Sequence, residues 1–124
     1  MSALRPVILI VDDEPGNLGA FSRSFRKEFE VVTADSGAAA IQAMQTHAVD
    51  VVITDYTMPN MNGIDVLHVV AEQWPAAKRL IVSGHADLPV LHDAARSGLA
   101  AQLLPKPWNK AEMLATIRRL LVPA

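Results

Sequence analysis

The sequence contains no cysteine among its 124 residues. Disulfide bonds and thiolate chemistry are therefore excluded, and a zinc site would lack its usual sulfur ligands. Basic residues are not in excess either, because the formal net charge is -2 and charged residues make up 19% of the chain. Domains that bind nucleic acid usually carry a basic excess, so we expect no direct contact with nucleic acid.

Long apolar segments are missing as well. The apolar run after residues 1–6 is too short for a signal peptide, and no segment could span a bilayer. We therefore expect a cytoplasmic protein without a membrane partner. The hydrophobic share of 51% can fill one core at this length. Residues 1–124 are accordingly expected to form a single domain.

Short β-branched runs that stop at polar residues predict buried strands. The clearest runs are residues 7–11, 51–54 and 80–82. Two further runs, residues 31–34 and 102–104, are shorter or less apolar. Because proline cannot donate a hydrogen bond to a sheet, Pro105 indicates that the last strand ends early.

Between these runs, apolar residues recur at helical spacing. Leu18, Phe21, Phe25 and Phe29 form such a stripe after Pro15, which is suited to start a helix. Four more helices are expected. One follows Ser36, and the next covers residues 64–74 and is stopped by Pro75. Of the last two, one is capped by Asp87, carries Val90 in its apolar stripe and is closed by Gly98, and the other is capped by Asn109. Five strand–helix units in succession imply an α/β fold, a (βα)5 three-layer sandwich around a parallel sheet.

Polar side chains follow the predicted strands at the points where they end. Asp12 and Asp13 follow the first strand, Asp55 the third, Ser83 the fourth and Lys106 the fifth. Ligands of open α/β sheets bind beyond the carboxyl ends of the strands. We therefore expect these side chains to meet on one rim of the sheet.

Three carboxylates on one rim repel one another unless a cation lies among them. Oxygen ligands suit a hard divalent cation, Mg²⁺ above all. Taken singly, each group has a plain structural explanation as a turn residue, a helix cap or a solvated loop lysine. Together, a nucleophilic carboxylate, a metal site and the cationic Lys106 meet the needs of phosphoryl transfer to aspartate.

The motifs as a set resemble the receiver domains of two-component response regulators, essentially from end to end. Residues 11–15 resemble the acidic motif of that family, and residues 54–63 its phosphoacceptor strand and loop. Ser83–Gly84 and Lys106–Pro107 match its hydroxyl and basic motifs. The resemblance implies a flavodoxin-like parallel five-stranded sheet of order 2-1-3-4-5.

The same resemblance implies roles for the acidic residues. Asp55 would accept a phosphoryl group from a phosphohistidine on a sensor histidine kinase or phosphotransfer protein. Mg²⁺ would be bound by Asp13, Asp55 and the backbone carbonyl of Thr57, and by Asp12 mostly through water. The chain would then be a signalling domain that assists its own phosphorylation and dephosphorylation, and not an enzyme.

The resemblance also implies that Ser83 and Lys106 hold the phosphoryl oxygens and that the bond between Lys106 and Pro107 is cis. Thr57 and His85 occupy two variable positions that tune phosphoryl lifetime in the family. His85 is equally well explained as an exposed loop histidine. Trp108 is expected to be a packing residue.

Leu103 stands where many receivers carry a switch tyrosine or phenylalanine. Its side chain is shorter and has no hydroxyl, so the usual aromatic gating is not available. We therefore expect a small rearrangement confined to residues 83–87 and the start of the helix that follows.

Alternatives from other classes remain open. A phosphorylation-independent interaction module of the same fold would usually have lost a carboxylate or the lysine, whereas this site is complete. A flavin-binding protein would need a Ser/Thr/Gly-rich phosphate loop after the first strand, where this chain has acidic residues. A nucleotide hydrolase would need a Gly-x-x-x-x-Gly-Lys-Ser/Thr loop, which is absent.

The output is not encoded in these motifs. The chain is expected to be either a stand-alone receiver or the N-terminal part of a longer regulator with an output domain or effector protein. Residues 83–87 and 105–108 resemble receivers found beside signalling hydrolases or kinases more than those that precede winged-helix DNA-binding domains.

Overall fold

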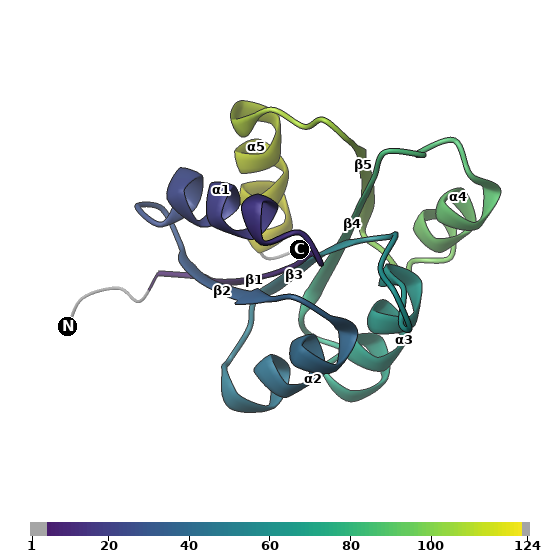
Figure 1. The fold of residues 1–124 in the computed structure, drawn as a ribbon, viewed down its shortest axis with the longest axis horizontal. Helices are drawn as coiled ribbons and strands as arrows, with labels where there is room; N and C mark the ends of the chain where they lie inside the picture. The colour runs from purple at the N-terminus through teal and green to yellow at the C-terminus, as the bar shows by residue number, and fades with distance from the viewer. Residues whose placement is uncertain (1–4, 123–124) are drawn as a thin grey trace.

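The computed structural model describes residues 5–122, so the two ends of the expected domain, residues 1–4 and 123–124, lie outside the described residues. Strands and helices alternate along the chain (Figure 1). The elements are β1 (Val7–Val11), α1 (Pro15–Phe25), β2 (Glu30–Ala34), α2 (Gly37–Thr46), β3 (Val51–Asp55), α3 (Gly63–Gln73), β4 (Lys78–Ser83), α4 (Pro89–Arg96), β5 (Gln102–Pro105) and α5 (Lys110–Leu121). Within the described part of the chain, every helix is too short or too polar to cross a membrane.

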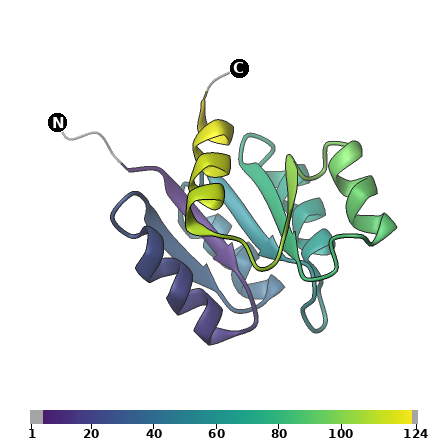
Figure 2. The same cartoon turned by 90° about the horizontal axis from the view of Figure 1, so that it is seen from above.

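The five strands form one parallel sheet in the order β2-β1-β3-β4-β5. Helices α1 and α5 cover one face, and α2, α3 and α4 cover the other (Figures 1 and 2). The predicted flavodoxin-like three-layer sandwich is therefore confirmed. In this order β3 lies at the centre, so the residue that ends it is surrounded by the ends of its neighbours.

The strands differ in burial according to their place in the sheet. All five residues of β3 are buried, whereas the edge strands β2 and β5 each have one buried residue. An edge strand can also tolerate proline, because alternate N–H groups point away from the sheet. The expectation that β5 ends before Pro105 is wrong, since Pro105 belongs to β5 and pairs with Ser83.

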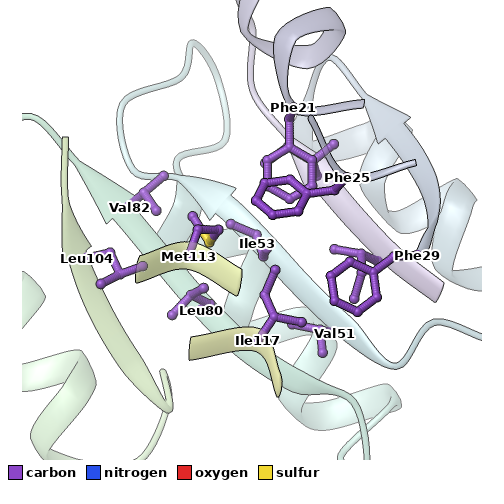
Figure 3. Close-up of a cluster of buried hydrophobic side chains, with 12 residues drawn as sticks. Phe21, Phe25, Phe29, Val51, Ile53, Leu80, Val82, Leu104, Met113 and Ile117 are labelled. Atoms are coloured by element: carbon purple, nitrogen blue, oxygen red, sulfur yellow. The ribbon is translucent and has the colours of Figure 1, made fainter. Parts of the chain in front are cut away.

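Two different cores lie on the two faces. The face under α1 and α5 is rich in aromatic rings, with Phe21, Phe25 and Phe29 beside the aliphatic side chains of the sheet and α5 (Figure 3). Trp108 packs against this cluster, as expected of a packing residue. The buried side chains of the opposite face are aliphatic or methionine.

The N-cap predicted at Asn109 is confirmed, and the structure shows two N-caps that were not predicted, at Ser36 and Asn62. The side chain of Ser36 accepts a hydrogen bond from the N–H of Ala39, and that of Asn109 accepts one from Glu112. Helix α3 has a full capping box, in which Asn62 and Asp65 each accept from the other's backbone N–H.

Helix α4 begins differently from the prediction. Asp87 does not cap it: the N-cap is Leu88, which has no side-chain hydrogen bond, and Pro89 is the first residue of the helix. Val90, expected in the apolar stripe, is 43% exposed. The predicted end is correct, because Gly98 follows the helix with a positive φ of 86°.

The C-terminal end of α4 is tied to the sheet through Arg79 on β4. Its Nε donates to the carbonyl oxygen of Leu99 at 2.7 Å, and its Nη2 donates to that of Gly98 at 3.4 Å. One end of α4 is therefore anchored, while its other end lacks a capping side chain.

One predicted stripe crosses an element boundary. Phe21 and Phe25 lie in α1, but Phe29 lies in the turn that follows the helix. Its ring still stacks beside Phe25, with 6.2 Å between the ring centroids. The hydrophobic pattern therefore identified the buried residues correctly and placed the end of the helix too late.

Candidate functional site at the carboxyl ends of the strands

Three carboxylates meet at the carboxyl ends of β1 and β3. Asp12, Asp13 and Asp55 each offer an oxygen atom, and these oxygens lie within 4.8 Å of one another. Asp12 is 4% exposed and Asp55 is 8% exposed, whereas Asp13 is open to solvent. The acidic cluster predicted from the sequence is therefore formed by the fold. Two of its members are buried and one faces the solution.

Asp12 is held in place by several donors. Its Oδ1 accepts from the backbone N–H of Glu14 at 2.9 Å, and its Oδ2 accepts from the side-chain amide of Asn17 at 3.1 Å. The sequence analysis missed Asn17. The signal was present, because a helix that starts at Pro15 puts Asn17 in its first turn, next to the acidic motif.

Lys106 bridges two of the carboxylates from the opposite side. Its Nζ lies 3.3 Å from Asp12 Oδ2 and 3.2 Å from Asp55 Oδ1. The bond between Lys106 and Pro107 is cis, as the resemblance implied. The ammonium group therefore already touches the carboxylate that was predicted to be the phosphoacceptor.

Asp55 has an altered proton affinity. Burial raises the pKa of its carboxyl group above the ordinary value, the ammonium of Lys106 opposes this change, and the charge of Asp12 adds to it. The ionised form of Asp55 is thus less favoured here than in water, which is the condition in which a bound cation would help most.

Ser83 closes the site on the β4 side. It is 1% exposed, and its Oγ accepts a hydrogen bond from the backbone N–H of His85 at 2.9 Å. Its carbonyl oxygen accepts from the N–H of Lys106 at 2.9 Å, which joins the ends of β4 and β5. The hydroxyl is therefore engaged with its own turn.

The two residues predicted to tune lifetime lie in exposed loops. Thr57 follows β3 and His85 follows β4, and both are exposed. Their positions beside the ends of the central strands are compatible with the predicted role, which stays a prediction.

Gly63 fixes the loop after the phosphoacceptor strand. Its N–H donates to the carbonyl oxygen of Tyr56 at 2.9 Å, so α3 starts against the end of β3. A Cβ atom at this position would lie 2.4 Å from the backbone oxygen of Asp55. Only glycine allows this close approach.

Leu103 lies away from the carboxylates, on the face covered by α3 and α4. It is partly buried and packs against a small cluster of buried aliphatic residues that includes Ile81 and Leu91, as do Tyr56 and Leu88. No aromatic ring takes the place of a switch residue on β5, whose residues all lie in the described part of the chain.

The donor set of this site suits a hard cation. Asp12, Asp13 and Asp55 carry three negative charges, and Lys106 supplies one positive charge, which leaves an excess of negative charge. Carboxylate oxygens are the preferred ligands of Mg²⁺, and the solvent-facing side leaves room for water ligands. The residues present therefore fit a magnesium ion.

Comparisons with known proteins show the family of this chain. Residues 8–118 match the family model described as response regulator receiver domain. The chain is 30% identical over 119 residues to the hydrogenase transcriptional regulatory protein HoxA of Cupriavidus necator, covering 96% of this chain and 25% of that protein. It is 35% identical over 113 residues to the transcriptional regulatory protein KdpE of Mycobacterium tuberculosis, covering 90% and 49%. The chain thus spans half or less of the length of these relatives.

A solved structure shows the same arrangement of elements. The signal receiver domain of an HD domain-containing protein from Pseudomonas fluorescens aligns with a TM-score of 0.88 at 29% identity, covering 94% of each chain. The fold and the family evidence therefore point in the same direction as the rim of carboxylates and lysine.

Proposed function

Because the chain belongs to the response regulator receiver domain family, we propose that it is a signalling switch that accepts a phosphoryl group on Asp55 in the presence of Mg²⁺. The observation that carries the proposal is the contact of Lys106 with both Asp55 and Asp12 inside the acidic cluster. A nucleophilic carboxylate, a cation site and a fixed ammonium group are the parts that phosphoryl transfer to aspartate requires.

In the proposed reaction, a carboxylate oxygen of Asp55 attacks the phosphorus of the donor. A new O–P bond forms while the N–P bond of a phosphohistidine breaks, and the histidine nitrogen that leaves takes up a proton. Bound Mg²⁺ would neutralise charge on the phosphoryl oxygens and would be held by Asp12, Asp13, Asp55 and the carbonyl of Thr57. Because Asp55 is 8% exposed, few water molecules can surround its carboxylate.

The residues on the β4 and β5 side would hold the product. Lys106 can move its ammonium group from Asp55 to a phosphoryl oxygen with a small change of its side chain, because the two carboxylates it bridges are already close. Ser83 can turn its hydroxyl from the N–H of His85 toward the phosphoryl group. The phosphorylated and free states would therefore differ in the contacts of these two side chains.

The biological setting follows the family and is part of the proposal. The donor would be a sensor histidine kinase or a phosphotransfer protein, and an output domain or separate effector would respond to the phosphorylated state. Residues 1–124 would act as one domain, located in the cytoplasm, without direct contact with nucleic acid. Its own contribution to phosphorylation and dephosphorylation makes it a signalling domain and not an enzyme.

The direct test is phosphorylation by acetyl phosphate with Mg²⁺, followed by intact-mass measurement and peptide mapping. We expect one phosphoryl adduct, located on Asp55, and none in Asp55→Asn, which keeps the shape but removes the nucleophile. The matched control is Asp35→Asn, a change of the exposed aspartate that follows β2 on the same rim. An equal adduct on Asp55→Asn would refute the proposal.

A second test separates the role of the Lys106 ammonium group from that of the Mg²⁺ site. In Lys106→Ala we expect Mg²⁺ binding to remain and the response to the product mimic beryllofluoride to weaken, because the ammonium donor is gone. Lys110→Ala removes an exposed lysine nearby and should leave both unchanged. Loss of Mg²⁺ binding in Lys106→Ala alone would show that the lysine supports the metal site instead.

A further inference from the structure

Signal transmission in this chain cannot use an aromatic side chain on β5. Leu103 is already packed with Ile81 and Leu91, and it has neither a ring nor a hydroxyl. Another aromatic residue would have to take the place of the missing ring on β5. Only a residue that contacts the moving groups of the site and has space to move could serve.

Trp108 is the aromatic residue nearest in sequence to Lys106, and the two residues line one pocket. It lies two residues after Lys106, and its ring packs edge-on against Phe21 with 5.7 Å between centroids and tilted against Phe25 at 5.9 Å. Both phenylalanines belong to α1 and are almost completely buried. The indole thus connects the lysine segment with the helix that follows the acidic motif.

Space to move is present beside the indole. A pocket of about 430 Å³ opens between α1 and the loop that joins β5 to α5. Trp108 and Lys106 line it together with Asp12. Its apolar part is formed by Ile10, Ala20, Phe21, Val82 and Pro107. Trp108 therefore borders a pocket that is partly open to solvent and that also reaches Asp12 and Lys106 of the site.

The backbone restricts which part of this segment can respond. The N–H of Lys106 is fixed to the carbonyl oxygen of Ser83 at 2.9 Å, and Asn109 is fixed as the cap of α5 by its 2.7 Å contact with the N–H of Glu112. Between these two points lie Pro107 and Trp108. A change in the Lys106 side chain therefore acts on a short segment with fixed ends.

We propose that Trp108 is the aromatic switch residue of this chain, which responds when Lys106 leaves Asp12 and Asp55 for a phosphoryl oxygen. The inference rests on the proposed phosphorylation of Asp55. Lys106 and Trp108 line the same pocket, so a change in the position of the lysine side chain alters the space next to the indole. The ring then shifts against Phe21, and the surface formed by α1 and the β5–α5 loop changes shape. This is a wider response than the one predicted from the sequence, which was confined to residues 83–87 and the start of α4.

The chain offers a direct optical test, because it has two tryptophans. Trp74 follows α3 and lines a different groove with Asp50, at the opposite end of β3 from Asp55. The variant Trp74→Phe reports on Trp108 alone, and Trp108→Phe reports on Trp74 alone. Emission is recorded after Mg²⁺ and again after beryllofluoride, so that the effect of the metal is measured separately.

We expect the emission of Trp74→Phe to change on addition of beryllofluoride several times more than that of Trp108→Phe. Adding Lys106→Ala to Trp74→Phe should remove most of this change. An unchanged Trp108 signal, or equal changes at both tryptophans, would overturn the inference. Fluorine NMR of bound beryllofluoride and the acetyl phosphate adduct show independently whether the site is functional, so failure of the proposed function is recognised separately.

Because Trp108→Phe could loosen the aromatic cluster, the same question is asked without removing the ring. In the wild-type protein, the indole Nε1–H resonance of Trp108 should shift on addition of beryllofluoride, while that of Trp74 stays in place. The two resonances are assigned with the single-tryptophan variants. A shift of Trp74 alone would contradict the assignment of the switch to Trp108.

Discussion

The two halves of the rim are built differently. On the β1 side, Asp12 has a fixed orientation, because the N–H of Glu14, the amide of Asn17 and the ammonium of Lys106 all contact its oxygens. On the β4 side, Ser83 has one contact to its own turn, and the helix beyond it starts at Leu88 without a capping side chain.

Under the proposed function, this difference would give the two halves different tasks. A metal site benefits from ligands that are oriented before the ion arrives, because no ordering is then needed on binding. A switch needs an element with two accessible positions. The well-ordered half would therefore bind the cation, and the loosely held half would register the phosphoryl group.

The strongest way to break the ordered half is to remove a ligand. We expect Asp13→Ala to lower the affinity for Mg²⁺ about tenfold or more, because a charged oxygen ligand is lost from the cluster. Titration calorimetry or NMR measures the effect. Asp35→Ala removes an equal charge from the end of β2 and should bind Mg²⁺ almost as the wild type does. Equal affinities in wild type and Asp13→Ala would refute the assignment of the site.

A milder change tests whether orientation matters. Asn17→Ala keeps every carboxylate but removes the amide that donates to Asp12. Partners of this kind commonly change metal affinity by about tenfold or more, and we expect an effect of a few-fold to about tenfold because Asp12 keeps two other donors. Ser22→Ala on the same helix is the control. An unchanged affinity in Asn17→Ala would mean that Asp12 needs no orientation.

Burial of Asp55 lowers the stability of the folded protein, and the pH dependence of unfolding can reveal this cost. Burial raises the pKa of Asp55, so the folded protein holds that proton more tightly than the unfolded chain, and stability is lost as the pH rises through the pKa. In metal-free buffer near neutral pH, Asp55→Asn should melt a few degrees above the wild type. The difference should shrink as the pH approaches the ordinary aspartate pKa of about 4. A variant that is equally or less stable at neutral pH would contradict this.

The smallest effects are expected in the exposed loops. Thr57→Ala and His85→Ala should change the lifetime of the phosphoryl group a few-fold without preventing its formation. Both side chains are exposed and are predicted to act on the path of the attacking water. Decay of the adduct is followed by intact mass after removal of acetyl phosphate. Complete loss of labelling in either variant would show that the residue is required and not modulatory.

Much of this arrangement could be predicted from the sequence because buried parallel strands have a strong pattern. The β-branched runs of β1, β3 and β4 end at polar residues, and the topology brings those ends together. The edge strands were less evident, since β2 and β5 each bury one residue and carry little periodic signal. The chemistry of the site was therefore easier to predict than the limits of the elements around it.

The sequence alone could not show which of several neighbouring residues takes a given structural role, or how two segments are spaced. Asp87 is a good capping residue, yet Pro89 fixes the first turn of α4 and makes Leu88 the N-cap. Asn17 could be placed in the first turn of α1 from the sequence, but its contact with Asp12 depends on how the end of β1 and the start of α1 are oriented. Trp108 was correctly expected to pack, but the free volume beside it depends on how α1 and the β5–α5 loop are spaced.

Because Arg79 holds the segment at one end of α4 and no side chain caps the other end, the two ends of this helix are not equally fixed. The hydrogen bonds of Arg79 to the carbonyl oxygens of Leu99 and Gly98 hold the segment that follows the C-terminal end of the helix, where Gly98 has a positive φ. The helix has eight residues, so its free end lies about 12 Å from the held end. A small tilt about the held end would therefore be amplified at the start of α4, next to the loop that carries His85. Arg79 and Gly98, both remote from the phosphoacceptor, would then determine how far the start of α4 can move.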